Sequence, residues 1–251
     1  MLKFVQREED EILRYLTGIQ SCSNHTISDV KFWTVEGGTV ISMPLGGDWV
    51  TSLENCDEQL WSVALQLLEA VEFMHKHNVA HMDLKPQNIL IPPEGGRLSI
   101  IDFSISIHVR SPSDMYVGVV GTEDYIAPEI REGPYKPLLA DLWSCGKTLK
   151  ELCLRCRPSA ARKKLLAVSS QLMNYDPEAR PTMSTVLGWM ASARQERGNA
   201  FPDITSYVEV FLTVLHCTYI CLCRTFPTAP MSAHELFPFQ PSMQQIPATL
   251  L

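Results

Sequence analysis

The sequence predicts an α+β fold in which a few short strands and one helix come first and helices dominate the remainder. Two observations support this prediction. Short runs rich in β-branched and aromatic residues occur at 28–35 and 39–43, and a long amphipathic helical pattern follows at 57–77. The chain has 251 residues, of which 45% are hydrophobic and 20% charged. Such a chain can bury enough apolar surface to fold as one domain, with or without an appendage.

The remaining elements follow from periodicity and turn residues. Residues 6–17 form an amphipathic pattern with acidic residues in its first turn, which favours a helix N-terminus there. A turn at 36–38 joins the two early strands. Short β-rich runs at 88–91 and 98–101 flank a Pro- and Gly-rich stretch, which predicts a hairpin. Apolar spacing predicts three further helices, at 139–154, 160–174 and 182–193.

Charge and cysteine content exclude several classes of protein. The chain has 21 Lys and Arg against 28 Asp and Glu, a net charge of −7, whereas nucleic-acid binding normally needs a basic surface. We therefore expect no nucleic-acid partner. The first residues hold no apolar signal-peptide core, and the eight cysteines form no complete zinc pattern. We expect an intracellular protein, in the cytoplasm or nucleus, with reduced thiols.

Five chemistry-bearing motifs occur in order along the chain. The first runs from His81 to Asn88 (HMDLKPQN), and Ile101-Asp102-Phe103-Ser104 follows it. The other three are GTEDYIAPE at 121–129, DLWSCG at 141–146 and DPEARPT at 176–182. Any one of them can arise by chance, but five in this order cannot plausibly do so.

This series resembles the eukaryotic protein kinase family, in a divergent form similar to its fungal members. It is of Ser/Thr type because Lys85 stands two residues after Asp83. The resemblance implies a bilobal kinase-like fold with a mostly helical C-terminal lobe and an N-terminal lobe reduced to a few strands plus one helix. It also implies ATP and Mg²⁺ as cofactors and Ser or Thr hydroxyls of a protein substrate as acceptors. Phosphoryl transfer asks a protein for positioning and charge neutralisation more than for covalent chemistry.

The resemblance assigns roles to five residues at the centre of this chemistry. Asp83 would orient the substrate hydroxyl and accept its proton, and Lys85 would neutralise charge on the moving phosphoryl group. Thr122 would form hydrogen bonds near Asp83 and Lys85. Asn88, which also belongs to the catalytic loop, and Asp102 offer two oxygen ligands, the sparse kind of site that suits Mg²⁺ shared with substrate phosphates.

Nucleotide binding is expected to involve residues outside this centre. Lys3 has the apolar surroundings of the family's ATP-binding lysine, and Glu9 stands where its helix partner belongs. Only five residues separate them, a reach of at most ~20 Å, and a frayed terminal residue is the alternative for Lys3. The resemblance adds Asp48 as a ribose contact and Leu90 and Asp102 as further cofactor-binding residues.

Other residues of the motifs are expected to be structural. His81 and Phe103 would belong to a packed column beneath the active site. Asp141 would brace the backbone of the catalytic loop from the start of a buried helix. Glu129 and Arg180 would form an ion pair that anchors the segment after Thr122.

The sequence also departs from the family pattern. It contains no G-x-G-x-x-G phosphate loop, Met82 replaces the usual Arg before the catalytic Asp, and Ser104 replaces the Gly after Phe103. That Arg normally captures a phosphate on the activation segment, which Met cannot do. Two alternatives to an active kinase therefore stay open: a pseudokinase that serves as a binding or scaffold module, and an N-terminally truncated kinase fragment.

The kinase-like domain is expected to end near residue 197. We divide the chain into an N-terminal lobe remnant, a C-terminal lobe and an extension, at residues 1–45, 46–197 and 198–251. Within the extension, 208–223 is an apolar run of 16 residues, short of the ~20 that a membrane span needs. A packed or interfacial helix, a membrane helix and an unstructured segment stay open for this run, and a membrane contact is not expected. The last residues have the composition of an unstructured tail.

Overall fold

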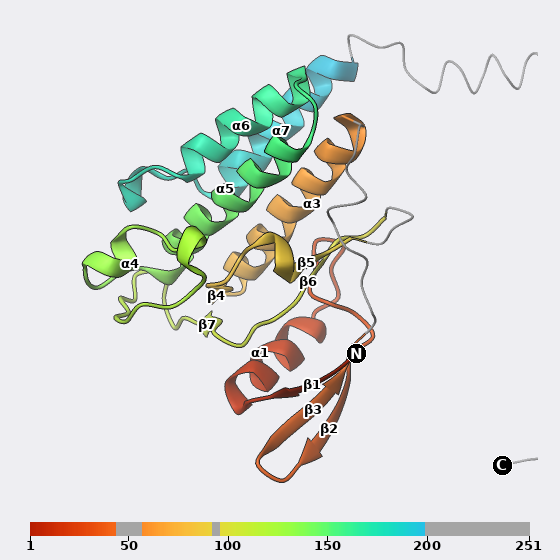
Figure 1. Cartoon of the computed structure of the whole chain (residues 1–251), viewed down its shortest axis with the longest axis vertical. Helices are drawn as coiled ribbons and strands as arrows, with labels where there is room; N and C mark the ends of the chain where they lie inside the picture. The colour runs from red at the N-terminus through yellow and green to blue at the C-terminus, as the bar shows by residue number, and fades with distance from the viewer. Residues whose placement is uncertain (44–56, 92–95, 199–251) are drawn as a thin grey trace, which may run out of the picture. The chain divides into compact units, whose positions relative to one another are not determined.

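The computed structural model describes residues 1–43, 57–91 and 96–198 (Figure 1). Residues 1–194 form one compact unit, and residues 195–251 form a second, of which only the end of one helix is described. The first unit is a mixed α+β structure with small sheets and several helices, as the sequence predicted. Asp48 and the run 208–223 lie outside the described residues.

The first sheet is three-stranded and antiparallel, in the order β1-β3-β2. Its strands are β1 (Leu2–Val5), β2 (Lys31–Val35) and β3 (Gly38–Ser42). The register pairs Lys3 with Ile41 and Ile41 with Phe32, so these three side chains share one face of the sheet. Ile41 is fully buried there. The predicted strand at 28–35 begins only at Lys31, and Asp29 just before it has a left-handed φ of 57°.

Helix α1 (Arg7–Thr17) follows β1 directly. Its buried side chains are Glu9, Ile12, Leu13 and Leu16, a stripe at helical spacing. The helix ends where the N–H of Gly18 returns to the carbonyl of Arg14. Glu9 is the one charged residue in this buried stripe, so its carboxylate needs a hydrogen-bonding or ionic partner.

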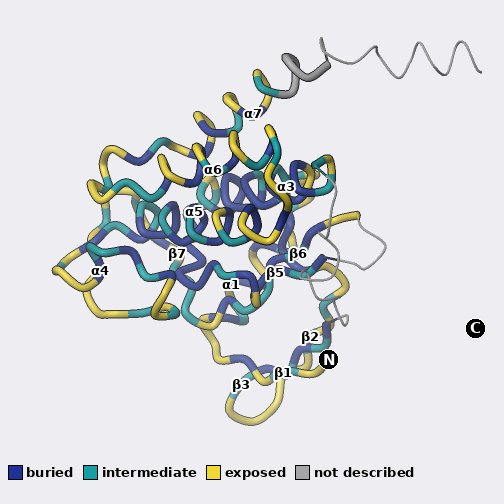
Figure 2. The backbone as a smooth tube through the Cα atoms, turned by 45° about the horizontal axis from the view of Figure 1, so that its top comes forward, coloured by how far each residue is buried: buried dark blue, intermediate teal, exposed yellow. Residues whose placement is uncertain are grey.

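The remaining helices form the larger part of the unit (Figure 1). They are α3 (Asp57–Lys76), α4 (Glu129–Glu132), α5 (Pro137–Arg155), α6 (Ala160–Leu172) and α7 (Met183–Gly198). Single 3₁₀ turns lie between them: η1 (Pro86–Asn88), η2 (Glu123–Tyr125) and η3 (Pro177–Ala179). Figure 2 shows that many of the residues of α3 and α5 are buried. None of the described helices is both long and apolar enough to cross a membrane.

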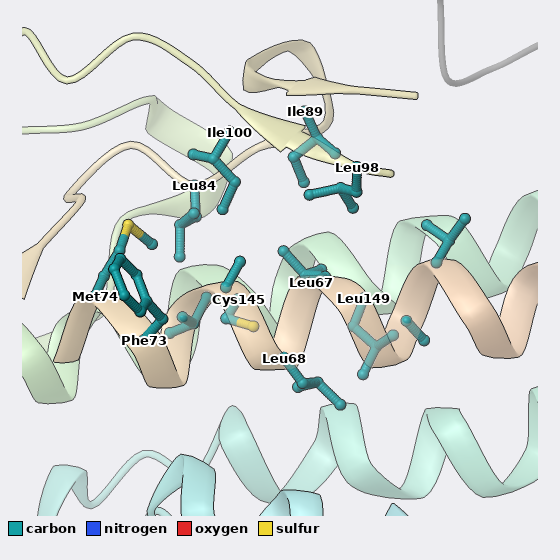
Figure 3. Packing of buried hydrophobic residues seen from close by; sticks show 14 of the residues in the cluster. Leu67, Leu68, Phe73, Met74, Leu84, Ile89, Leu98, Ile100, Cys145 and Leu149 are labelled. Atoms are coloured by element: carbon teal, nitrogen blue, oxygen red, sulfur yellow. The ribbon is translucent and has the colours of Figure 1, made fainter. Parts of the chain in front are cut away.

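The main core lies between α3, α5 and a small hairpin (Figure 3). Leu67 of α3 and Leu149 of α5 are fully buried within it. Helix α6 packs closely on α5 at Gly146. A Cβ added at this glycine would come within 2.8 Å of the Leu172 Cβ. Only glycine fits there, so the two helices approach more closely than larger residues would allow. This core supports the loops that carry the site.

Two pairs of short antiparallel strands frame those loops. Strand β4 (Val79–Ala80) pairs with β7 (Ile107–His108), and β5 (Ile89–Leu90) pairs with β6 (Ser99–Ile100). The predicted hairpin is β5–β6, which the Pro- and Gly-rich stretch between its strands indicates in the sequence. Strands β4 and β7 lie far apart along the chain and have no such turn between them. The loop with Asp83 lies between β4 and β5, and the segment with Asp102 lies between β6 and β7.

Candidate active site

A buried carboxylate holds the backbone of the loop that follows β4. Asp141, near the start of α5, is fully buried. Its Oδ2 accepts the backbone N–H of His81 at 2.6 Å, and its Oδ1 accepts that of Met82 at 2.8 Å. Met82 has a left-handed φ of 66°, so the backbone changes direction just before Asp83. Asp141 therefore braces this loop as the sequence indicated.

The His81 ring has a single hydrogen-bonding arrangement. Its Nδ1 lies 3.2 Å from the backbone N of Asp83, which is a donor, so Nδ1 accepts and Nε2 carries the proton. Nε2 then donates to the carbonyl of Ile101 at 3.0 Å. The ring packs edge-on against Phe103, with centroids 4.8 Å apart. Burial lowers the pKa of His81, so the neutral ring is a structural link between the two loops.

Asp83 lies at the centre of a closed hydrogen-bonded cluster. Thr122 Oγ1 donates to Asp83 Oδ1 at 2.6 Å, and Lys85 Nζ donates to Asp83 Oδ2 at 2.6 Å. Lys85 Nζ also donates to Thr122 Oγ1 at 2.7 Å, which closes a triangle of three side chains. The carboxylate is mostly buried, with 11% of its side chain exposed. The structure thus brings together three of the residues predicted to be catalytic.

Asn88, the fourth of those residues, is held against the same carboxylate. Its Nδ2 donates to the Asp83 backbone carbonyl at 2.9 Å and to Asp83 Oδ2 at 3.1 Å. Because both of these contacts use the amide nitrogen, the Oδ1 of Asn88 is the atom left to ligate a cation. Asn88 belongs to η1, which is one turn long and leads directly into β5.

The backbone that carries Thr122 approaches the loop closely. Gly121 has a φ of 105°, and a Cβ on it would lie 2.9 Å from the carbonyl oxygen of Met82. Both the positive φ and this contact require glycine. The glycine therefore lets Thr122 reach Asp83, a role that the sequence motif by itself did not reveal.

Lys3 connects three segments of the chain. Its Nζ lies 2.6 Å from Glu9 Oε1 and 2.7 Å from Asp102 Oδ1, although Asp102 is 99 residues away in sequence. Burial acts to lower the pKa of Lys3, but hydrogen bonds to the two carboxylates prevail and raise it. Lys3 is therefore an ordered cation within the unit and not a frayed terminal residue.

The two carboxylates respond differently to this cation. Burial raises the pKa of Glu9, and the Lys3 ammonium and the Phe103 N–H oppose that rise. Burial also acts to raise the pKa of Asp102, but hydrogen bonds from Lys3 and Ser104 prevail and lower it. Sequence reasoning treated Ser104 only as a departure from glycine; its hydroxyl and N–H are partners of Asp102. Asp102 therefore stays ionised, with 36% of its side chain exposed.

The residues predicted to hold Mg²⁺ fit that ion in their chemistry. Asn88 and Asp102 contribute an amide oxygen and an ionised carboxylate, the oxygen ligands that Mg²⁺ prefers. In the described parts of the chain, no group of three or more His, Cys, Asp and Glu side chains is arranged to hold a metal. With two protein ligands, Mg²⁺ would take its remaining ligands from phosphate oxygens and water.

The two remaining cofactor-binding predictions have different outcomes. Leu90 lies in β5, is partly buried and packs against the main core. Asp48 is outside the described residues. The ion pair predicted between Glu129 and Arg180 is present, with Nη1 and Oε1 2.6 Å apart.

A comparison with family models identifies the chain. The model described as protein kinase domain matches residues 48–185, more than half of the sequence. The chain belongs to the protein kinase family. The sequence-based resemblance to this family is therefore confirmed, and members of the family typically use ATP and Mg²⁺ and act on proteins.

Individual relatives of this kinase domain are protein kinases, and two of the three described below are named as serine/threonine-protein kinases. The chain is 47% identical over 87 residues to the serine/threonine-protein kinase HAL5 of Saccharomyces cerevisiae, covering 32% of this chain and 10% of that protein. It is 32% identical over 193 residues to a CDPK-related protein kinase of Daucus carota, covering 71% of this chain and 31% of that protein. It is 35% identical over 124 residues to serine/threonine-protein kinase 17A of Oryctolagus cuniculus, covering 47% and 31%. The chain thus spans a third or less of the length of these relatives.

Proposed function

We propose that this chain transfers the γ-phosphoryl group of Mg²⁺-bound ATP to Ser or Thr hydroxyls of protein substrates. The observation that carries the proposal is the closed triangle of Asp83, Lys85 and Thr122 in a chain of the protein kinase family. In this proposal the first sheet and α1 form a reduced N-terminal lobe, and the segments from α3 onward form the C-terminal lobe.

The acceptor end of the reaction rests on Asp83. Its carboxylate is fixed by Thr122 on one oxygen and by Lys85 on the other, so it can receive a substrate hydroxyl without reorganising. It orients that hydroxyl and accepts its proton as the oxygen attacks phosphorus. Lys85 lies on the same loop and neutralises negative charge on the transferred group. Thr122 contacts both Asp83 and Lys85 and holds these two side chains in fixed positions relative to each other.

The nucleotide end rests on Lys3, Glu9 and Asp102. Glu9 and Asp102 hold the Lys3 ammonium between them, and in this proposal the ammonium binds phosphate oxygens of the nucleotide. Asp102, together with the Oδ1 of Asn88, would hold Mg²⁺, which when bound neutralises charge on the phosphates. Leu90 would line the floor beneath the base, and Asp48 would contact the ribose. These assignments follow the family pattern residue by residue.

The proposal is tested by phosphoryl transfer from γ-labelled ATP to a generic protein substrate such as myelin basic protein. The wild-type chain should label the substrate on Ser and Thr, and Asp83→Asn should abolish the label. Asp29→Asn is the matched control, because Asp29 is exposed in a loop and has a φ of 57° that Asn tolerates. That variant should transfer phosphate at the wild-type rate.

The other outcomes have distinct meanings. Binding of Mg²⁺-ATP by folded protein without transfer to any substrate would overturn the enzymatic proposal in favour of a pseudokinase. Transfer that persists in Asp83→Asn would remove Asp83 from its assigned role. Label on Tyr alone would contradict the substrate class.

A further inference from the structure

Tyr15 makes a set of contacts that the proposed chemistry does not use. It lies in the last turns of α1, and its ring stacks on His108 with centroids 5.0 Å apart and planes inclined by 22°. The same ring meets His77 edge-on at 6.1 Å, and its hydroxyl lies 3.5 Å from His77 Nδ1. The His77 ring packs in turn on Phe73 of α3 at 4.7 Å. Tyr15 thereby joins α1 to two segments far from it in sequence.

The two histidines belong to one small platform. His108 is in β7 and is paired with Val79 of β4, and the N–H of Val109 donates to the carbonyl of Asn78 at 2.8 Å. His77 directly follows Lys76, the last residue of α3, and precedes Asn78. We define the histidine platform as His77, His108 and the β4–β7 pair that connects them.

The platform is continuous with both loops of the site. Strand β4 leads directly into His81 and Asp83, and β7 begins five residues after Asp102. A side chain docked on the platform is therefore held in a fixed position relative to the backbone that carries Asp83 and Asp102. Tyr15 is such a side chain, and it stands on the helix that carries Glu9.

Besides its buried apolar stripe, α1 has two separate contacts that fix it against the rest of the site. Glu9 meets Lys3 and the Phe103 N–H near the first turn, and Tyr15 meets the platform six residues later, ~9 Å along the helix axis. The buried side chains of Ile12, Leu13 and Leu16 hold α1 on the core, and the Tyr15 contact limits rotation of the helix about that stripe. Without the Tyr15 contact, α1 can turn on the core and carry Glu9 away from Lys3.

We propose that Tyr15 is a positioning residue: its docking on the histidine platform holds α1 where Glu9 keeps Lys3 in place for nucleotide phosphates. This inference rests on the proposed function. Tyr15 is 41% exposed, so its ring adds little to the buried core, which α1 reaches through Ile12, Leu13 and Leu16. Its proposed role is therefore to orient the helix.

The test compares Tyr15→Ala, Tyr15→Phe and Tyr175→Ala. Tyr175 is the matched control because its ring also has one edge contact, on Trp143 at 5.5 Å, and it is 79% exposed. Tyr15→Ala should raise both the KM and the Kd for Mg²⁺-ATP about 2- to 10-fold, the effect of losing one ring stack. The KM for the protein substrate should not change. Tyr15→Phe keeps the stack and should remain close to wild type.

A further variant identifies the partner of Tyr15. His108→Ala should weaken Mg²⁺-ATP binding by a similar factor, and adding it to Tyr15→Ala should bring little more, because both changes remove the same stack. Fully additive effects would show that the two residues act independently and would overturn the proposed docking.

Amide hydrogen exchange of the nucleotide-free protein separates this inference from the proposed function. Tyr15→Ala should speed exchange in α1, with α5 unchanged, and Tyr175→Ala should leave α1 as in wild type. A wild-type chain that bound no nucleotide would overturn the proposed function, and the exchange result would still decide whether Tyr15 holds α1. Unchanged exchange in α1, or an unchanged Kd for ATP in a chain that binds it, would overturn the positioning role.

Discussion

Arg180 and Glu129 form a bidentate ion pair at the end of the segment that carries Thr122. Nη1 lies 2.6 Å from Oε1 and Nη2 lies 2.8 Å from Oε2, and the Arg180 side chain is completely buried. The guanidinium also donates to the carbonyls of Leu139 and Asn174, at 2.7 and 2.8 Å. The pair therefore ties α4 to the start of α5 and to the loop before η3.

Neutralising Glu129 should be strongly destabilising. Glu129→Gln leaves the Arg180 cation buried without its counter-charge, and breaking a buried pair from one side costs about 3–5 kcal/mol of unfolding free energy. Urea denaturation measures the loss. Glu178→Gln is the matched control, because it breaks an exposed pair with Lys136 at 2.6 Å and should cost at most about 1 kcal/mol. Equal losses in the two variants would show that burial of Arg180 contributes little.

Removing the Lys3 ammonium should weaken nucleotide binding. Lys3→Met leaves Glu9 and Asp102 without the cation that they share, and the site loses its positive charge for phosphates. A tenfold weaker Kd would reduce stabilisation by saturating Mg²⁺-ATP by about 1.4 kcal/mol. Thermal unfolding with and without nucleotide measures this difference. Lys31→Met, on the exposed edge strand β2, should retain the full nucleotide response, and a Lys3→Met variant that did so too would contradict the assigned role.

The long helices were the part of the fold best predicted from sequence. The pattern at 57–77 corresponds to α3 (Asp57–Lys76), because periodicity over five turns identifies one apolar face. Strands β4 and β7 escaped prediction because no turn links them and their pairing depends on contacts between distant segments. Strands β5 and β6 are equally short, but the turn residues between them predicted their pairing. The sequence signal thus comes from long periodic elements and from local turns.

A similar division applies to the candidate site. Asp83, Lys85 and Asn88 share one loop, so the motif already places them close together. The contact of Lys3 with Asp102 spans 99 residues and was not evident from any local pattern. The same holds for Tyr15 on His108, because neither residue lies in a motif. Through the family that it resembles, the motif series also predicted contacts between distant segments, such as Glu129 with Arg180. Contacts of residues outside the motifs come from tertiary packing alone.

Acidification should destabilise the fold partly through His81. Burial lowers the pKa of His81 from its ordinary value of 6.5, so below pH 6.5 the unfolded chain takes up a proton that the native chain refuses. Stability therefore falls as pH decreases from 7.5 to 5.5, at a rate approaching about 1.4 kcal/mol per pH unit for one histidine. Urea denaturation across this range measures the slope.

A variant assigns that slope to the residue. His81→Phe can keep the packing on Phe103 but cannot titrate, so its unfolding free energy should depend less on pH, whatever its absolute stability. The slope should not vanish, because burial also lowers the pKa of His25. An undiminished slope in His81→Phe would mean that His81 is protonated equally in the native and unfolded chains.

Adding one methyl group at Gly121 should impair transfer more than binding. Gly121→Ala combines the strain of a φ of 105° with a contact of 2.9 Å between the new Cβ and the Met82 carbonyl oxygen. The backbone must shift to relieve that contact, and Thr122 then moves away from Asp83. Because misplacement of about 1 Å can cost 10²-fold in rate, kcat should fall at least about tenfold. The Kd for Mg²⁺-ATP should stay the same, since Lys3 and Asp102 are not displaced.

The control for this change is Gly118→Ala. Gly118 has a similar φ of 108°, but a Cβ there would meet nothing within 4 Å. Both variants should therefore lose stability through backbone strain, of about 1–3 kcal/mol, and only Gly121→Ala should lose kcat. If both variants lost kcat equally, strain in the segment would be the cause. The close approach of Gly121 to Met82 would then have no part in aligning Thr122 with Asp83.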